Sequence, residues 1–330
     1  MPRQSRLDAP GTLHHVIGRG IEGSKIFRNR GDREDFLAHL AKLCEAKALS
    51  VYAWALMDSH FHLLVRSGNE FLSHSMRRLL TGYAVSYNRR HRRYGHLFQN
   101  RYKSILCEED PYLLELARYI HLNPVRGRVV KDWKELRVYP WAGHSAIVGR
   151  QKRGWQDVGT VLGYFGQRKK RAIVAYENYV IEGIEKGKRP ELVGGGLIRS
   201  MEGWSEVLSL RRRGEKTASD ERILGSGEFI EQLLSEAEEK AKETLGWRGR
   251  VASLQALLSK ISKRDGVEEE KGRGGDRRRS VVGVRKLFFQ IAVRRLGYSG
   301  AAVARFLGVT TSLVNRYASS EEVGNLDQYL

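Results

Sequence analysis

The spacing of apolar residues between positions 12 and 123 switches repeatedly between a period of two and a period near 3.6. Such switching indicates alternating strands and helices. The alternating segments predict four strands, at Thr12–Gly18, Val51–Met57, His60–Val65 and Leu97–Cys107. Helical spacing predicts three helices, from Asp32 to Ala48, from Phe71 to about Arg90, and from Asp110-Pro111 (as N-cap and first helical residue) to Asn123. The order βαββαβα predicts an α+β, ferredoxin-like split βαβ sheet with helices on one face.

The composition adds a strong excess of positive charge. The 330 residues include 58 Lys or Arg and 38 Asp or Glu, so the formal charge at pH 7 is 58 − 38 = +20. A charge of this size favours a polyanionic partner, most simply nucleic acid. Two cysteines are too few for a disulfide framework and indicate a reducing compartment. With no apolar run of membrane-spanning length and no secretory signal, we expect a cytoplasmic, nucleoid-associated protein without a membrane partner.

The densest basic stretch, Met76–Ile105, holds eight Lys or Arg residues and no Asp or Glu, and aromatic residues are interleaved with them. Basic side chains neutralise phosphates, and aromatic rings offer stacking faces to unpaired bases. A solvated helix face with its aromatic residues in the core is the alternative interpretation. We predict a nucleic-acid-binding surface made by Arg77, Arg78, Arg89, Arg90, Arg92, Arg93, Arg101 and Lys103.

The segment His60-Phe61-His62 lies in a predicted strand, so its two histidines share one face while Phe61 points to the other. Two imidazoles in these positions can hold one divalent cation. For this pattern alone, two histidines bonded to backbone or solvent are at least as common.

The last predicted helix places Tyr119 and Asn123 four residues apart and therefore on one face. A neighbouring apolar stripe can dock on the sheet; it consists of Leu113, Leu116, Ala117 and Ile120. A helical tyrosine is most often a packing residue whose hydroxyl is bonded. The pattern of the helix alone therefore does not assign chemistry to Tyr119.

Taken together, these motifs resemble those of the single-tyrosine HUH transposases, and within them the REP-associated tyrosine transposases. The resemblance is carried by the H-x-H strand, by GHLFQNRYKS in the basic stretch and by YIHLNPVRG in the last helix. The segments RLDAPGTLHHVIGRG and IFRNRGDREDFL also match. The resemblance covers roughly residues 3–150, and H-x-H followed by Y-x-x-x-N-P-V is its specific part.

The resemblance implies an HUH nuclease domain over residues 1–150, with Tyr119 as nucleophile and His60 and His62 as metal ligands. Asn123 would complete the metal site, at a position where many minimal relatives carry Gln. The implied reaction is metal-dependent cleavage and rejoining of single-stranded or hairpin DNA through a 5′-phosphotyrosine. The mixed ligand set suits Mg²⁺ or Mn²⁺, with Zn²⁺ as the alternative for the histidines. Both a monomer and a homodimer fit the family.

The second half of the chain carries weaker signals. Residues 151–226 are expected to form a linker or helical extension, with a Gly- and Arg-rich part at Glu191–Ser226. Glu228–Leu245 predicts an acidic amphipathic helix, and Gly266–Ser280 predicts a charged loop. Helices are predicted at Val281–Leu296, Ala301–Leu307 and Thr310–Ala318.

The last of these helices predict that residues 227–330 form a helical DNA-binding domain, with a helix-turn-helix at about residues 285–318. The segment resembles the DNA-binding domain of the replication initiator DnaA, with Thr311, Asn315 and Arg316 on the recognition helix. Duplex DNA is the partner that this resemblance implies. A small helical bundle that only packs or dimerises is the alternative.

Three functions follow from these observations. The leading hypothesis is a single-strand DNA nickase and strand-transferase. The second is a catalytically inactive DNA- or RNA-binding regulator that keeps the same sheet. The third is a double-stranded DNA-binding factor that works through the C-terminal helices. The presence of His60, His62, Tyr119 and Asn123 together favours the first.

Overall fold

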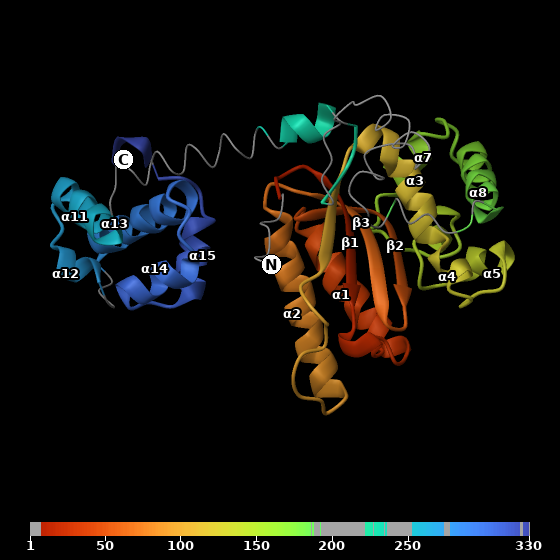
Figure 1. Ribbon diagram of the computed structural model, residues 1–330, viewed down its shortest axis with the longest axis horizontal. Helices are drawn as coiled ribbons and strands as arrows, with labels where there is room; N and C mark the ends of the chain where they lie inside the picture. Colours follow the sequence, from red (N-terminus) through yellow and green to blue (C-terminus); the bar gives the residue numbers. More distant parts are fainter. Residues whose placement is uncertain are drawn as a thin grey trace, which may run out of the picture. The chain divides into compact units, whose positions relative to one another are not determined.

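The computed structural model describes residues 8–185, 187, 192, 222–226, 228–233, 235, 253–273, 278–323 and 326–329. The chain divides into two compact units, Met1–Gln232 and Leu233–Leu330 (Figure 1). Each is described by itself below. Within the described ranges, no helix is both long enough and apolar enough to cross a membrane.

The first unit is built on a mixed sheet with strand order β2-β3-β1-β4-β5. The strands are β1 (Leu13–Arg19), β2 (Leu49–Met57), β3 (His60–Ser67), β4 (Lys103–Cys107) and β5 (Ile223–Leu224). β1 lies between β3 and β4 and is antiparallel to both, and β2 is antiparallel to β3. The short β5 is parallel to β4, and no sequence pattern predicted it. The α+β class and the order of the first seven elements agree with the sequence prediction.

Helices cover both faces of this sheet. α1 (Arg30–Glu45) and α2 (Leu72–Arg90) pack on one face, and α3 (Glu109–His121) packs on the other (Figure 1). The prediction of helices on one face is therefore wrong. The reason lies in the central strands β1 and β3, which are buried along almost their whole length, so that both of their faces need a cover.

The helix α1 begins at Arg30, two residues before the predicted start. Asn29 is its N-cap, and the Oδ1 atom of Asn29 accepts a hydrogen bond from the Asp32 backbone N–H at 2.9 Å. Asp32 is fully buried, and its side-chain carboxylate accepts a hydrogen bond from the Arg28 backbone N–H at 2.8 Å. The acid that we expected to open the helix thus anchors its first turn from within.

The predicted strand Leu97–Cys107 is only half formed, since β4 begins at Lys103. The chain before it turns at Gly95, whose φ of 84° is easily adopted only by glycine. It then follows the loop after β1: Phe98 forms an isolated bridge with Gly20, and the Leu97 carbonyl accepts a hydrogen bond from the Ile21 N–H at 3.1 Å. Residues 95–102 are therefore an irregular segment beside α2 rather than part of the strand.

The third predicted helix is divided in two. α3 begins at Glu109 and ends at His121, and Asn123 then begins the short helix α4 (Asn123–Arg126). Pro124 lies in the first turn of α4, where its missing N–H breaks no helical hydrogen bond. The proline therefore starts a new helix here instead of ending the old one.

The first unit continues through α5 (Trp133–Val138), α6 (His144–Ile147), α7 (Val158–Gly163) and α8 (Lys169–Glu185). Ala172, Tyr176 and Val180 of α8 are buried in the same core as α3. The Tyr176 hydroxyl lies 2.6 Å from Nδ1 of His121. The helical part of residues 151–226 thus supports α3, while most of Glu191–Ser226 lies outside the described residues.

The second unit contains α11 (Leu254–Asp265), α12 (Glu269–Gly272), α13 (Arg279–Gln290), a π-helical turn (Ile291–Arg295), α14 (Gly300–Leu307) and α15 (Thr311–Ala318). The predicted loop Gly266–Ser280 contains α12. Arg285 of α13 donates hydrogen bonds to the carbonyls of Gly272 and Lys271, at the end of α12, at 3.0 and 3.3 Å. Of the predicted helix Glu228–Leu245, residues 228–233 are described as helical and most of the rest lies outside the described ranges.

Candidate active site

The two histidines of the H-x-H motif lie on the face of β3 that is covered by α3. In the register between β1 and β3, His60 stands opposite Arg19 and His62 stands opposite Ile17. The His62 side chain is buried and that of His60 is half-buried. Their ring centroids are 5.3 Å apart. The alternation predicted for this strand therefore puts both imidazoles on one side of the sheet, where they lie next to each other.

A third histidine, His15 of β1, joins this pair. It is fully buried, and its Nε2 atom lies 3.0 Å from Nδ1 of His62, within hydrogen-bond distance. Its own Nδ1 lies 3.3 Å from the carbonyl oxygen of Leu192. No motif singled out His15, although one signal was present in the sequence. In a strand, His15 lies on the same face as Leu13, and so faces one of the two cores.

Tyr119 of α3 faces the histidines. Its half-buried ring meets His15 edge-on, with 6.0 Å between centroids, and His62 in the same way at 6.1 Å. The apolar stripe of α3 holds the helix on the sheet, because Leu113, Leu116, Ala117 and Ile120 are all fully buried in the core beneath it. Tyr119 is thereby positioned by two rigid elements, a helix and a sheet.

Two arginines that the sequence analysis did not single out set the charge around the tyrosine. The Arg126 guanidinium lies over the Tyr119 ring, 5.0 Å from its centroid, and donates a hydrogen bond to the Tyr119 carbonyl at 3.4 Å. Arg19 is exposed at the end of β1. Burial raises the pKa of the Tyr119 hydroxyl above its usual value, and the positive charges of Arg126 and Arg19 oppose this rise. The site therefore favours a negative charge on the tyrosine oxygen more than burial alone would.

The same burial keeps the histidines uncharged. It lowers the pKa of His62 well below 6.5, and the neighbouring His15, His60 and Arg19 lower it further. Burial and Arg19 also lower the pKa of His60. Neutral imidazole is the form that ligates metal ions, so the electrostatics of the site suit this role.

Each predicted metal ligand has one side-chain atom that could bind a cation. The hydrogen bonds of both rings use Nδ1, from His62 to His15 and from His60 to the Ser59 hydroxyl at 3.2 Å. Nε2 of each ring is thus the atom that remains for a metal. Asn123 donates from Nδ2 to the carbonyls of Tyr119 and Ile120 at 3.1 and 3.2 Å, which leaves Oδ1 as its ligating atom.

A metal site made only of acids, cysteines and histidines is not found in the part of the chain that the structure describes. There, no group of three or more such side chains is arranged to hold an ion. The predicted set is of a different kind, since it combines two histidines with an amide oxygen.

The predicted basic surface is divided by the structure. Arg77, Arg78, Arg89, Arg92, Arg101 and Lys103 are exposed. Arg93 is half-buried. Arg90 is exposed as well, but its guanidinium pairs with the buried Asp32 at 2.6 Å and with Asp35 at 2.9 Å and so links α2 to α1. Two of the interleaved aromatic residues, Tyr83 and Tyr87, are fully buried, whereas Tyr94 is 95% exposed.

The three predicted contacts of the second unit also differ. Arg316 is exposed and Thr311 is half-exposed. Asn315 packs against the start of α14, since a Cβ atom placed on Gly300 would lie 2.2 Å from the Asn315 Oδ1. The glycine at position 300 therefore permits a close approach between α14 and α15, and Asn315 occupies that contact.

Comparisons with known proteins give one family. Residues 11–123 match the family model described as "Transposase IS200 like". This range runs from just before β1 to the first residue of α4, and so includes all four side chains His15, His60, His62 and Tyr119. A solved structure titled "Structure of the REP associates tyrosine transposase bound to a REP hairpin" is 17% identical, covers 48% of this chain and 90% of that chain, and has a TM-score of 0.37. No curated protein sequence matches the chain.

Proposed function

We propose that this protein, whose residues 11–123 match the family model described as "Transposase IS200 like", is a metal-dependent single-strand DNA endonuclease and strand-transferase. The observation that carries the proposal is the meeting of Tyr119 with His62 and His15 on one face of the sheet. The proposed substrate is hairpin or palindromic repeat DNA. The first unit would then be a ferredoxin-like HUH nuclease domain.

In the proposed reaction, the Tyr119 hydroxyl oxygen attacks the phosphorus of the scissile phosphodiester. The bond between phosphorus and the 3′ oxygen breaks, the tyrosine loses its proton and the leaving 3′ oxygen gains one. The products are a 5′-phosphotyrosine and a free 3′-hydroxyl. One ester bond replaces another, so a second 3′-hydroxyl can attack the phosphotyrosine and join two strands without a nucleotide cofactor.

The residues around Tyr119 have separate tasks in this proposal. Nε2 of His60, Nε2 of His62 and Oδ1 of Asn123 would hold Mg²⁺ or Mn²⁺. When bound, such an ion polarises the phosphate and stabilises its developing charge. Arg126 holds the Tyr119 ring from one side by a cation–π contact. Arg19, exposed opposite His60, offers a fixed positive charge to the phosphate.

The DNA is proposed to contact two regions. Single strands would bind the basic side chains of α2, of the following segment and of the start of β4. These are the exposed Arg77, Arg78, Arg89, Arg92, Arg101 and Lys103 and the half-buried Arg93. Duplex DNA would bind α14 and α15 as a helix-turn-helix. Gly308 ends α14 with a φ of 68°, and the Thr310 hydroxyl caps α15, which together make a tight turn between the helices. Of the predicted contacts on α15, Arg316 is exposed and Thr311 is half-exposed.

The decisive experiment is a search for the covalent intermediate. Unmutated protein, incubated with hairpin-flanked single-stranded DNA and Mg²⁺ or Mn²⁺, should form an adduct that survives a denaturing gel. Tyr119→Phe should abolish the adduct while it folds and binds DNA normally. Tyr112→Phe, which alters another half-buried tyrosine of α3, is the matched control and should keep the adduct. If Tyr119→Phe still forms an adduct, another residue is the nucleophile. If the unmutated protein binds DNA but forms no adduct, the result favours the inactive regulator.

The role of the second unit needs a deletion at the right boundary. A cut at Gly266 would separate α11 from α13, although Leu257 and Ile261 of α11 are buried in one core with Phe288. Removal of Leu233–Leu330 takes away the whole unit. We expect this deletion to weaken duplex binding and leave the cutting of a short single strand intact. A folded deletion variant that cannot cut would make the second unit part of the catalytic machinery.

A further inference from the structure

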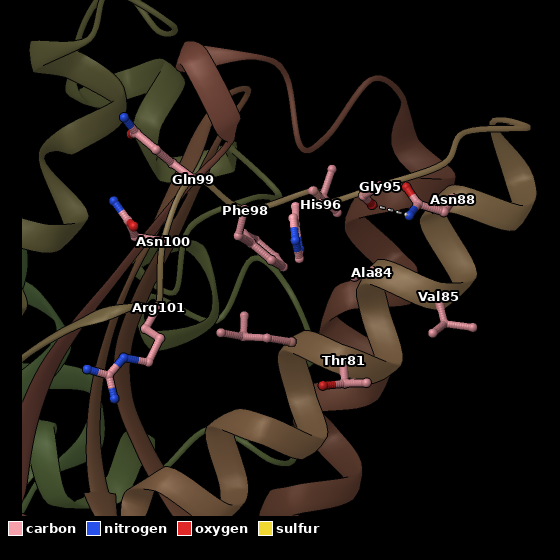
Figure 2. A pocket seen from close by; sticks show the side chains of 12 residues that line it. Thr81, Ala84, Val85, Asn88, Gly95, His96, Phe98, Gln99, Asn100 and Arg101 are labelled. Carbon is pink, nitrogen blue, oxygen red and sulfur yellow. Dashed lines mark hydrogen bonds between the residues drawn. The ribbon is translucent and has the colours of Figure 1, made fainter.

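A pocket of about 590 Å³ lies between α2 and the irregular segment that follows it (Figure 2). One wall is the apolar side of α2, made by Leu80, Ala84 and Val85. The other is made by Leu97 and Phe98, and Figure 2 shows the Phe98 ring directed into the space between the segment and the helix. The volume lies within the range of about 300–1,000 Å³ that is typical of small-ligand sites.

The pocket is already formed in the free protein. The Asn88 side chain of α2 donates a hydrogen bond to the Gly95 carbonyl at 2.9 Å, which ties the segment to the helix (Figure 2). Phe98 is supported by ring contacts with Phe61 and Tyr83, at 6.3 and 6.4 Å between centroids. Val85 nevertheless remains 65% exposed. The pocket therefore presents an apolar surface that the described part of the chain does not cover.

Its surroundings are unusually basic. The pocket lies within Met76–Ile105, which contains no acidic residue, and Arg101 is one of its lining residues. Arg89 and Arg92 are exposed close by in the chain. A ligand that suits this place combines negative charge with a flat apolar group. A nucleotide of single-stranded DNA has both, since its phosphates are anionic and its unpaired base can stack.

The pocket shares lining residues with a second hollow that lies next to the sheet neighbours of the two histidines. The second hollow, of about 410 Å³, is lined by Ile17, Arg19 and Lys103 and shares Gln99, Asn100 and Arg101 with the first. Ile17 and Arg19 stand directly opposite His62 and His60 in the sheet. A bound strand can therefore run from the histidines past residues 99–101 to the pocket beside α2.

We propose that the pocket between α2 and residues 95–101 binds one unpaired base of the single-stranded DNA substrate, beyond the phosphate that is cut. Phe98 and the apolar side of α2 contact the faces of the base. Gln99 and Asn100 also line the pocket, and their amides can donate and accept hydrogen bonds. The inference rests on the proposed function for the identity of the strand, but it concerns DNA binding and not the chemical step.

Two variants block the pocket from the side of α2. Val85→Glu places a carboxylate at an exposed position of α2, and Ala84→Leu adds bulk without charge. Val174→Glu is the matched control, since Val174 is a 57% exposed valine on helix α8. Base stacking on a protein side chain is worth enough to change affinity roughly tenfold. We expect both pocket variants to weaken single-strand binding by about that factor in fluorescence anisotropy at fixed salt.

Abasic substitution identifies the bound base. One nucleotide at a time is replaced by an abasic residue in the oligonucleotide. For unmutated protein and Val174→Glu, loss of the base should weaken binding about tenfold at one position or at two adjacent ones. In Val85→Glu and Ala84→Leu, the same abasic oligonucleotide should bind as the intact one does.

The outcomes separate this inference from the proposed function. If both pocket variants bind DNA as Val174→Glu does, or if the abasic effect persists in them, the pocket assignment is wrong. A pocket-dependent preference for RNA of the same sequence overturns the choice of DNA. Val174→Glu should form the adduct at the unmutated rate. If Tyr112→Phe cannot cleave DNA, or if Tyr119→Phe still can, the assignment of Tyr119 as the nucleophile is wrong. The assignment of the pocket as a base-binding site does not depend on that result.

Discussion

Strand β3 sends its side chains into two different environments. Phe61, Leu63 and Val65 are fully buried under α1 and α2, where Phe61 packs against Phe36 with 4.9 Å between ring centroids. His60 and His62 point to the side of α3, where His62 meets His15 and Tyr119. Neighbouring residues of one strand thus serve stability and chemistry separately, because side chains of a strand alternate between faces.

The polar face has a physical cost that the apolar face does not. Buried imidazoles lose hydration, and this loss is tolerated only when their nitrogens find partners. His15 and His62 solve the problem together, since each is the hydrogen-bond partner of the other. Substitutions on the two faces should therefore have different consequences, and this difference can be tested.

The largest effect is expected on the polar face. His60→Ala and His62→Ala should each abolish the covalent adduct while DNA binding persists, because binding rests on the basic surface. EDTA should have the same effect on the unmutated protein, and Mg²⁺ or Mn²⁺ should reverse it. Asn123→Ala should be milder, because water can replace one oxygen ligand. His74→Ala is the control, since His74 has an exposed side chain on α2. Full activity in chelator would remove the metal from the mechanism.

A substitution on the apolar face should show the reverse pattern. Phe36→Ala removes a fully buried ring that contacts Phe27, Phe61 and Tyr83. We expect it to lower the free energy of unfolding by about 3–5 kcal/mol, measured in urea. The fraction that remains folded at low temperature should still form the adduct. Unchanged stability together with a lost adduct would contradict the division between the two faces.

The adjacent histidines of β1 allow the sharpest comparison. His15 contacts His62, whereas His14 lies on the other face and bonds the hydroxyls of Thr12 and Ser104 at 2.8 and 3.1 Å. His15→Phe leaves Nδ1 of His62 without its partner, so Mn²⁺ affinity should fall by about 10–100-fold. His14→Phe should lower stability and leave that affinity unchanged. Titration of Mn²⁺, followed by electron paramagnetic resonance, measures the Mn²⁺ affinity of both variants. If both lose the same affinity, His15 does not position His62.

Acid should destabilise both sides of the sheet. Burial lowers the pKa of His14 to about 4, and burial together with Arg137 lowers that of His144 to about 4, both from 6.5. Between these values the unfolded chain binds more protons than the folded one, so stability falls as the pH falls from 6.5 towards 4. At pH 5 each histidine should cost about 2 kcal/mol relative to pH 7. Urea midpoints at both pH values test this, and His144→Gln should reduce the slope.

Much of the candidate site was predictable from local patterns. The period of two in His60–Val65 placed both histidines on one face, and the period of 3.6 separated Tyr119 from the apolar stripe of its helix. The element order also predicted the succession of strands and helices up to α3. These features depend on neighbours a few residues away, and the geometry of a strand or helix determines them wherever the element lies.

Other features depend on which distant segments meet. His15 bonds His62 only because β1 pairs with β3 in one particular register. Arg90 was expected at the DNA surface, yet its guanidinium pairs with the buried carboxylate of Asp32, 58 residues away in the sequence. The same is true of the pocket, which exists because residues 95–101 leave the predicted strand and lie along α2.

By itself, the sequence determined the succession of strands and helices up to α3, the shared faces of their side chains and the basic character of the surface, since backbone periodicity and charge are local properties. Only the tertiary structure decided that α3 covers the opposite face of the sheet, that His15 completes the histidine cluster and that Asn315 packs against Gly300. Those outcomes follow from strand register and close packing, which arise when the whole chain buries its apolar surface at once.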